Sequence, residues 1–319
     1  MIGILVPLDG SRLAEQAIRH AAAIATAYPA ELTLLRVISE LGSDRRMPID
    51  CVDLQLERRQ VEAYLENLAR ELRAAGIRVN WVVQEGKAAE TISRYAADAA
   101  TDLVVLSRFG RGGITDFGGG SVALKVVATC PVCVLVVGAS AEDVPVQEPV
   151  RYERILVPVD GSLSAEWALG MSVTIAAAHD ATLYIVQIVQ ESNLSSRLVQ
   201  TRDLEEALNR MHRSVRAEAT RRISELKAQL PLSTKFQTNV VSARDVASAL
   251  YTEAEKANVD LIVMSAHGDR NDCGWRYGPV CESLLAHTRR PVLVLQQTQV
   301  QFSERFRCFH LGETQVDAG

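Results

Sequence analysis

Aromatic residues are scarce in this chain of 319 residues, and neither sign of charge predominates strongly. Phe, Trp and Tyr together make up 5% of the sequence, while the hydrophobic share is 48%. Cores built from aliphatic side chains are typical of α/β proteins with buried parallel strands. The formal net charge of −5 gives no reason to expect a nucleic acid or an anionic membrane surface as a partner.

Long apolar runs and ordered cysteine patterns are also missing. No apolar run reaches the length of a membrane span, and no positively charged leader precedes the first apolar run at 2–8. The six cysteines are scattered, so we expect a reducing cytoplasm and no disulfide framework. Cys130 and Cys133 have redox-motif spacing, but they lie between a helix end and an apolar run, which favours buried thiols over a redox or metal role.

The most informative segment is residues 103–122, which read LVVLSRFGRGGITDFGGGSV. An apolar strand ends in a loop with six glycines, and Ser121 then opens a helical pattern. Glycines let the backbone approach a ligand, and a helix start offers unpaired N–H groups and partial positive charge. This segment therefore predicts a phosphate site.

The chain contains one long internal repeat. ILVPLDGS at 4–11 returns as ILVPVDGS at 155–162, and DLVVLSRFG at 102–110 returns as DLIVMSAHG at 260–268. A repeat of about 150 residues indicates a domain duplication rather than a solenoid. We predict a domain at 1–140, a linker at 141–151, a second domain at 152–300 and a C-terminal tail at 301–319.

Strand and helix patterns alternate in both copies, which predicts a parallel sheet with helices on both faces. In the first copy we expect strands at 2–8, 31–38, 78–84, 102–107 and 133–137, and helices at 12–27, 53–75, 88–99 and 122–128. In the second copy we expect strands at 154–159, 182–189, 234–241, 260–265 and 292–296, and helices at 163–178, 201–229, 244–257 and 279–287. The helix at 201–229 mixes arginines with glutamates, which favours a solvated face over an anion-binding patch.

The two openings and the glycine-rich loop together resemble a tandem-domain universal stress protein, over nearly all of residues 1–300. The family's nucleotide motif is G-x2-G-x9-G-[S/T]. It falls on Ser107, Gly110, Gly120 and Ser121 in the first copy, with serine in place of the first glycine. In the second copy it falls on Ser265, Gly268 and Gly278, followed by Pro279.

This resemblance implies two tandem Rossmann-like α/β domains, each a five-stranded parallel sheet of order 3-2-1-4-5. It implies ATP across the carboxyl ends of strands 1 and 4, where the strand order reverses. The positions carried over to the first copy are Pro7, Asp9, Val37, Ser107, Arg108, Gly110, Gly120, Ser121 and Val122. The matching positions of a second, weaker site are Asp160, Ile188, Ser265, Ala266, Gly268 and Gly278.

Several of these residues also have a purely local interpretation. Asp9 is expected near the adenine, yet an acid before Gly-Ser can simply accept hydrogen bonds from local N–H groups. Arg108 and Arg111 either neutralise phosphate or are solvated loop side chains, and Asp116 adds a negative charge to the same loop. His267 is either a phosphate or ribose contact or a solvated histidine.

The resemblance implies an adenine-nucleotide-binding regulator of the stress response in the cytoplasm, with ATP, alone or with Mg²⁺, as its ligand. The sequence has no G-x4-G-K-[ST] loop and no general base aimed at a phosphate, Asp9 aside, so we expect little or no turnover. A slow ATP hydrolase and a nucleotide-independent interaction module that acts through protein partners remain as alternatives.

Assembly is expected to involve the fifth strands, 133–137 and 292–296, because bare sheet edges expose unpaired backbone groups. In the family such strands commonly pair across a two-fold axis, so we expect an internal pseudo-dimer and also a homodimer of chains. Phe302, Phe306 and Phe309 in the tail have helical spacing, which predicts either a short docked helix or a frayed end.

The two clefts are expected to be unequal. The first loop ends in GGGS at 118–121, which supplies backbone N–H groups and a hydroxyl. The second ends in WRYGP at 275–279, and Pro279 has no N–H to donate. We therefore expect ATP chiefly in the first copy, with the second cleft empty or weaker.

Overall fold

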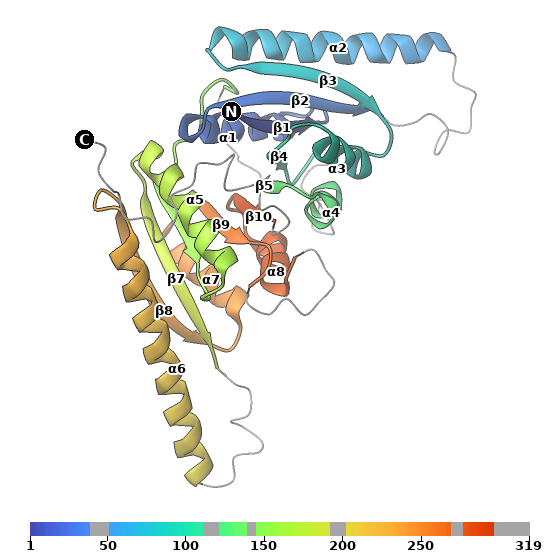
Figure 1. Ribbon diagram of the computed structural model, residues 1–319. Helices are drawn as coiled ribbons and strands as arrows, with labels where there is room; N and C mark the ends of the chain where they lie inside the picture. The colour runs from blue at the N-terminus through green and yellow to red at the C-terminus, as the bar shows by residue number, and fades with distance from the viewer. Residues whose placement is uncertain (39–50, 111–120, 139–144, 192–201, 269–276, 297–319) are drawn as a thin grey trace. The chain divides into compact units, whose positions relative to one another are not determined.

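The computed structural model describes residues 1–38, 51–110, 121–138, 145–191, 202–268 and 277–296. Strands and helices alternate within each copy of the repeat in the described residues (Figure 1). The first copy contains β1 Ile2–Leu8, α1 Arg12–Ala27, β2 Ala30–Ile38, α2 Cys51–Ala74, β3 Val79–Glu85, α3 Ala88–Asp98, β4 Leu103–Ser107, α4 Ser121–Thr129 and β5 Cys133–Val137. Each element was predicted, and the bounds differ by at most two residues.

The second copy repeats this order. It contains β6 Arg154–Pro158, α5 Leu163–His179, β7 Thr182–Gln190, α6 Arg202–Gln229, β8 Lys235–Ala243, α7 Val246–Lys256, β9 Leu261–Ser265, α8 Pro279–His287 and β10 Val292–Leu295. The largest corrections are that β8 extends to Ala243 rather than Val241 and that α7 begins at Val246 rather than Arg244. Asp245 explains the second correction, because its Oδ1 accepts a hydrogen bond from the Ser248 N–H at 2.6 Å and caps the helix.

The strands of the first copy follow the order β3-β2-β1-β4-β5, with parallel pairing throughout. The 3-2-1-4-5 order implied by the family resemblance is therefore confirmed in this copy. Strand β10 pairs antiparallel with β5, with Leu293 opposite Leu135. The expected pairing of the two fifth strands is confirmed as well.

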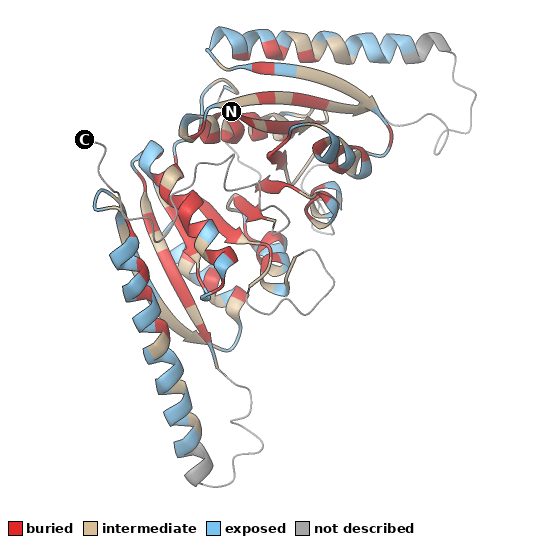
Figure 2. Ribbon diagram, viewed as in Figure 1, coloured by how far each residue is buried: buried red, intermediate tan, exposed pale blue. Residues whose placement is uncertain are grey.

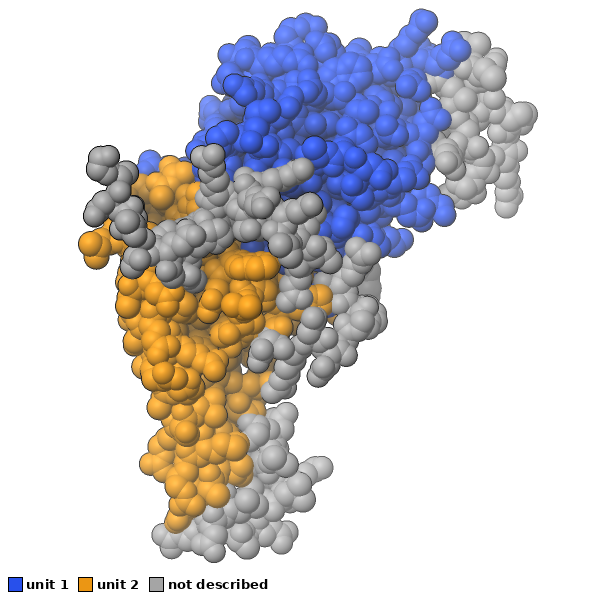
Figure 3. Space-filling view, viewed as in Figure 1, with its two compact units in different colours: residues 1–151, 274–277, 289–307 blue, residues 152–273, 278–288, 308–319 orange. Residues whose placement is uncertain are grey.

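The contacts divide the chain into two compact units, shown in separate colours in Figure 3. The first unit consists mainly of residues 1–151, and the second mainly of residues 152–273 and 278–288. In the second unit the order is β8-β7-β6-β9, again all parallel. Strand β10 belongs to the first unit by its contacts, together with its partner β5.

The cores are aliphatic and follow the central strands (Figure 2). Every residue of β5 is buried, and so is the run Leu103–Leu106 of β4. Helix α1 buries alanines and isoleucines against β1 and β4. Continuous apolar strands of this kind are the signature of a parallel sheet that is covered on both faces.

Equivalent aspartates fix the start of the first strand in each copy. Asp102 precedes β4, and its Oδ2 accepts a hydrogen bond from the Gly3 N–H at 2.8 Å. Asp260 precedes β9, and its Oδ2 accepts one from the Glu153 N–H at 2.7 Å. Asp102 therefore links the starts of β4 and β1, and Asp260 links the starts of β9 and β6. Both aspartates have a structural role at the amino ends of the strands, opposite the predicted cleft.

Candidate functional site

The predicted nucleotide site lies where β1 and β4 end side by side. These strands are adjacent and parallel, with Leu5 opposite Val104. Their carboxyl ends therefore reach the same edge of the sheet. This edge carries Asp9 after β1 and the segment 107–110 after β4.

Asp9 and Gly110 meet at this edge. Asp9 Oδ1 accepts hydrogen bonds from the Ser11 N–H at 2.9 Å and the Ser11 hydroxyl at 2.5 Å. A Cβ added at Gly110 would lie 2.2 Å from Asp9 Oδ2. The carboxylate thus has the local role that the sequence allowed, and a side chain at position 110 would force the Asp9 carboxylate to move.

The second copy reproduces this arrangement. Asp160 Oδ1 accepts a hydrogen bond from the Ser162 N–H at 2.9 Å. A Cβ at Gly268 would lie 2.2 Å from Asp160 Oδ2. The contact between an aspartate and the second motif glycine is therefore built into both copies, although other details of the two clefts differ.

The turn between strand and helix is formed in the same way in both copies. Gly10 has φ 78° and Gly161 has φ 88°, values that suit glycine. Ser11 and Ser162 then cap α1 and α5, because each hydroxyl accepts a hydrogen bond from the backbone N–H three residues later, at 3.2 Å. The GS pair in the ILVPxDGS motif is explained by this geometry without any ligand.

Two further groups of predicted residues flank the first cleft. Pro7 and Val37 belong to the paired strands β1 and β2, as Ile188 belongs to β7 in the second copy. On β4, Ser107 Oγ accepts a hydrogen bond from the Phe109 N–H at 3.3 Å. The Arg108 guanidinium lies 5.4 Å from the centre of the Phe109 ring, and its partial burial lowers the pKa of Arg108. Ser265, which matches Ser107, ends β9 in the same way.

The phosphate ends of the two motifs are described to different extents. In the first copy α4 begins at Ser121, and Val122 in its first turn is exposed. Gly120, Arg111 and Asp116 lie outside the described residues. In the second copy the Gly278 N–H donates to the Ala266 carbonyl at 2.7 Å, and Pro279 opens α8 with no N–H. In the second copy the Gly278 N–H is therefore already bonded to a protein carbonyl, and the next residue, Pro279, has no N–H to donate to a phosphate.

Side chains that the motif did not predict also reach the two strand-to-helix turns. In the first copy the Tyr64 hydroxyl of α2 donates to Glu15 Oε1 at 2.6 Å, and burial together with this bond raises the pKa of Tyr64. In the second copy Arg222 of α6 lies against the turn, since a Cβ at Gly161 would come within 2.3 Å of Arg222 Nη1.

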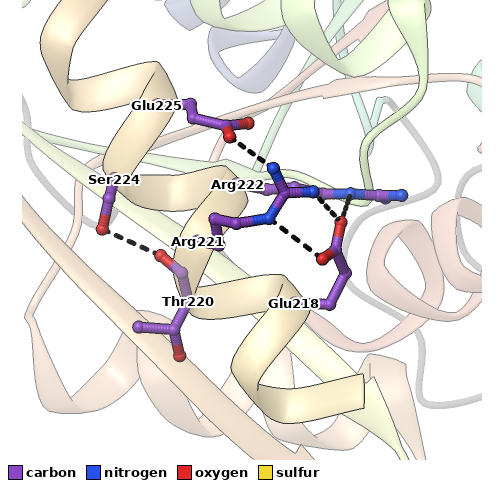
Figure 4. A network of polar contacts seen from close by, with 6 residues as sticks. All are labelled: Glu218, Thr220, Arg221, Arg222, Ser224 and Glu225. Carbon is purple, nitrogen blue, oxygen red and sulfur yellow. Dashed lines mark hydrogen bonds and ion pairs between the residues drawn. The ribbon is translucent and has the colours of Figure 1, made fainter. Parts of the chain in front are cut away.

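Figure 4 shows how Arg222 is held. Glu218 Oε1 accepts hydrogen bonds from Arg222 Nε at 3.2 Å and from Arg221 Nη2 at 2.8 Å, and Arg221 also contacts Glu225. The interpretation of this helix face as solvated ion pairs holds for Arg221 and also for Arg222, which pairs with the half-exposed Glu218. Arg222 also lies against the turn at Gly161, and no periodic or motif signal indicated that position.

The described residues hold no group of three or more His, Cys, Asp or Glu side chains that could bind a metal ion. Cys130, Cys133 and Cys281 are buried, and burial raises the pKa of the Cys281 thiol to about 12. Within the described part of the chain, no helix is long and apolar enough to cross a membrane. His267 is half-buried, and its carbonyl accepts a hydrogen bond from the Ser164 hydroxyl at 3.0 Å.

Known proteins show the same repeat and the same fold. The sequence model of the universal stress protein family matches residues 3–138 and again residues 151–296. A putative universal stress protein of Staphylococcus haemolyticus is 29% identical over 151 residues, which is 47% of this chain and 88% of the relative.

Two solved structures match over most of the chain. A universal stress protein from Archaeoglobus fulgidus aligns with a TM-score of 0.63 at 18% identity, covering 92% of this chain and 98% of the other. A putative universal stress protein from Pseudomonas aeruginosa aligns with a TM-score of 0.58 at 19% identity, covering 92% of each chain. At these identities the structures support the fold. With the family model matching both halves, this chain belongs to the universal stress protein family and carries two family domains in tandem.

Proposed function

We propose that this protein binds ATP in the cleft of its first copy and acts as a cytoplasmic regulator of the stress response, with little or no turnover. The observation that carries the proposal is the close approach of Gly110 to Asp9, which brings together the chain segments after β4 and β1, where the strand order reverses. Ligands in open α/β sheets bind at such points. In the sequence, the segment that follows Gly110 leads to the N-terminus of α4.

The electrostatics of the first copy suit a nucleotide. The N-terminus of α4 follows the glycine-rich segment directly, and helix N-termini attract phosphate through unpaired N–H groups and the helix dipole. Arg108 adds a positive charge at the end of β4. Hydrogen bonds from Ser11 fix the orientation of the Asp9 carboxylate before the adenine binds. This reduces the conformational entropy that the Asp9 side chain loses on binding.

The second cleft is proposed to bind ATP weakly. Its Gly278 N–H would have to give up the Ala266 carbonyl before it could donate to phosphate, and Pro279 offers no donor. A hydrogen bond to a charged group contributes roughly 1.5–3 kcal/mol, so two missing donors weaken binding by about two orders of magnitude or more.

Matched glycine substitutions test the assignment to the first copy. Gly110→Ala and Gly268→Ala each place a Cβ 2.2 Å from the aspartate of their own copy. We expect Gly110→Ala to weaken ATP binding by about tenfold to a hundredfold, and Gly268→Ala to leave the tight affinity unchanged. The affinity is measured by isothermal titration calorimetry, with and without Mg²⁺, and thermal denaturation checks that both variants are folded.

The opposite pattern, in which only Gly268→Ala weakens binding, would place the working site in the second copy. Failure of the wild-type protein to bind ATP would favour the interaction module, which is the alternative suggested by Ser107 and Ser265 at the first motif position. Release of ADP over hours, measured on the same samples, would favour the slow hydrolase.

A further inference from the structure

A groove in the second unit lies away from the predicted nucleotide cleft of its own copy. It has a volume of about 560 Å³ and lies between α7 and the strands β6, β7 and β8. Its lining includes Arg154 near the start of β6 and Asn258 just after α7, so it opens toward the amino ends of the strands. Asp160 and Gly268, by contrast, follow the carboxyl ends of β6 and β9.

The floor of this groove is one face of the parallel sheet. Leu156, Tyr184 and Gln237 are register partners on neighbouring strands, and Val186 pairs with Asn239 two residues further along. Register partners and residues two apart on a strand share a face. Tyr184 therefore lies in the floor between apolar strand residues and the amide side chains of β8, and all five residues line the groove.

The wall formed by α7 carries a polar network centred on Glu253. Its Oε2 accepts a hydrogen bond from Asn239 Nδ2 at 2.8 Å, and its Oε1 accepts one from Lys256 Nζ at 2.8 Å. Burial raises the pKa of Glu253, but the bonds from Lys256 and Asn239 outweigh it and hold the pKa below its usual value. Glu253 is therefore an ionised carboxylate at neutral pH, paired within the groove.

The first copy has other residues at the positions of Tyr184, Asn239 and Glu253, so the two copies of the repeat can be compared directly. Thr33 matches Tyr184 in the repeat, and Val82, the partner of Leu35, matches Asn239, the partner of Val186. Helices α3 and α7 both have 11 residues, so Tyr95 matches Glu253. The ring, the amide and the carboxylate that shape the groove are thus features of the second copy.

We propose that this groove binds a small neutral polyhydroxylated ligand, of the sugar or polyol class. Glu253 and Lys256 form an ion pair at 2.8 Å, so the carboxylate of the groove needs no cationic ligand, and Arg154 already donates to the Asn258 carbonyl at 3.4 Å. A neutral ligand can bind to the remaining polar groups without separating this ion pair. The carboxylate oxygens of Glu253 accept hydrogen bonds, and the side-chain amides of Gln237 and Asn239 can both donate and accept them.

A hydroxyl group suits such a lining, because it supplies one donor and two acceptor lone pairs. The ring of Tyr184 adds an apolar surface for the C–H face of a sugar. The volume lies within the range of about 300–1,000 Å³ typical of small-molecule sites. This inference does not depend on ATP binding, since no groove residue belongs to either motif.

The test uses the full chain with saturating ATP and three neutral probes: glucose, trehalose and myo-inositol. Saturation-transfer NMR titrations give the affinities, with glucose 6-phosphate and glucosamine as charged counterparts. We expect at least one neutral probe to bind at millimolar concentration and more tightly than its charged counterparts. Glu253→Tyr and Asn239→Val, which introduce the residues of the first copy, should each weaken that binding at least tenfold.

The control variant is Glu255→Gln, on the same helix but outside the groove lining, and it should bind the probe as the wild type does. Circular dichroism and thermal denaturation verify the fold of every variant. The proposal is overturned if no neutral probe binds at about 10 mM, if the charged probes bind more tightly, or if Glu253→Tyr and Asn239→Val bind as well as Glu255→Gln. Loss of ATP affinity in the Gly110 experiment leaves this result unaffected, so the two proposals fail separately.

Discussion

His20 is a buried ionisable residue on α1, where the second copy carries the equally buried Met171. Burial, assisted by the charge of Arg19, lowers the pKa of His20 from 6.5 to about 3. The unfolded chain therefore binds a proton at His20 below pH 6.5, while the folded chain does so only near pH 3. Stability from this residue is complete above pH 6.5 and is lost progressively as the pH falls toward 3.

Replacing His20 with methionine should remove this pH dependence. Between pH 6.5 and pH 5 the wild type should lose about 2 kcal/mol of unfolding free energy relative to His20→Met, at 1.36 kcal/mol per pH unit. Urea denaturation at several pH values gives the curves, and His287→Gln, at an exposed histidine, is the control. Parallel curves for the wild type and His20→Met would show that His20 does not carry this effect.

Single residues also show which features of the site could not be predicted from the sequence. The family resemblance predicted that Asp9 and Gly110 would follow neighbouring strands, but their direct contact was seen only in the structure. Tyr64 and Arg222 lie on α2 and α6, and their arrival at the turns depends on how these helices pack against the sheet. No local pattern encodes that packing, so these residues could not be predicted.

At the scale of elements, alternating apolar strands and amphipathic helices predicted every strand and helix that the structure describes. Hydrophobic periodicity fixes the middle of an element well and its ends poorly, because the ends depend on individual caps. Gly76, with φ 84°, ended α2 near the expected position. The Asp245 cap, which shortened α7, was missed because the preceding arginine continued the helical pattern.

The pairing of β10 with β5 leads to a prediction at this scale. Leu293 is buried and lies opposite Leu135, so Leu293→Ala should cost about 2–5 kcal/mol. Hydrogen exchange should rise at the β5 amides, 133–137, because their partner strand is weakened. Leu232→Ala, at a fully exposed leucine, is the control and should change stability by less than about 0.5 kcal/mol. Unchanged exchange in β5 after Leu293→Ala would contradict the pairing as a stabilising contact.

At the scale of the whole molecule, the duplication could be predicted because two motifs recur in the same order, at 4 and 155 and at 102 and 260, and the family model matches both halves. The pairing of β10 with β5 was expected from the family resemblance, but the assignment of β10 to the first unit was not, because it depends on contacts between segments far apart in the chain. The tail at 301–319 lies outside the described residues. Its docking stays a prediction, as does the homodimer.

Deleting residues 301–319 tests both. If Phe302, Phe306 and Phe309 dock on this chain or on a second copy, the truncated protein should melt at a lower temperature or change its mass in light scattering. A triple Phe→Ala variant of the full chain should reproduce the change. Identical melting temperatures and masses for all three proteins would mean that the tail contributes nothing, and a monomer mass over a wide concentration range would exclude the dimer.

The central claim is that two clefts with the same aspartate–glycine contact have unequal affinities for ATP. Calorimetric titration of the wild-type chain tests it most directly, because one experiment counts sites and measures their affinities. We predict one tight site per chain, with any second site weaker by about two orders of magnitude; Gly120→Val should abolish the tight site and Gly278→Val should preserve it. Two equal sites per chain, or a tight site lost only with Gly278→Val, would contradict this assignment.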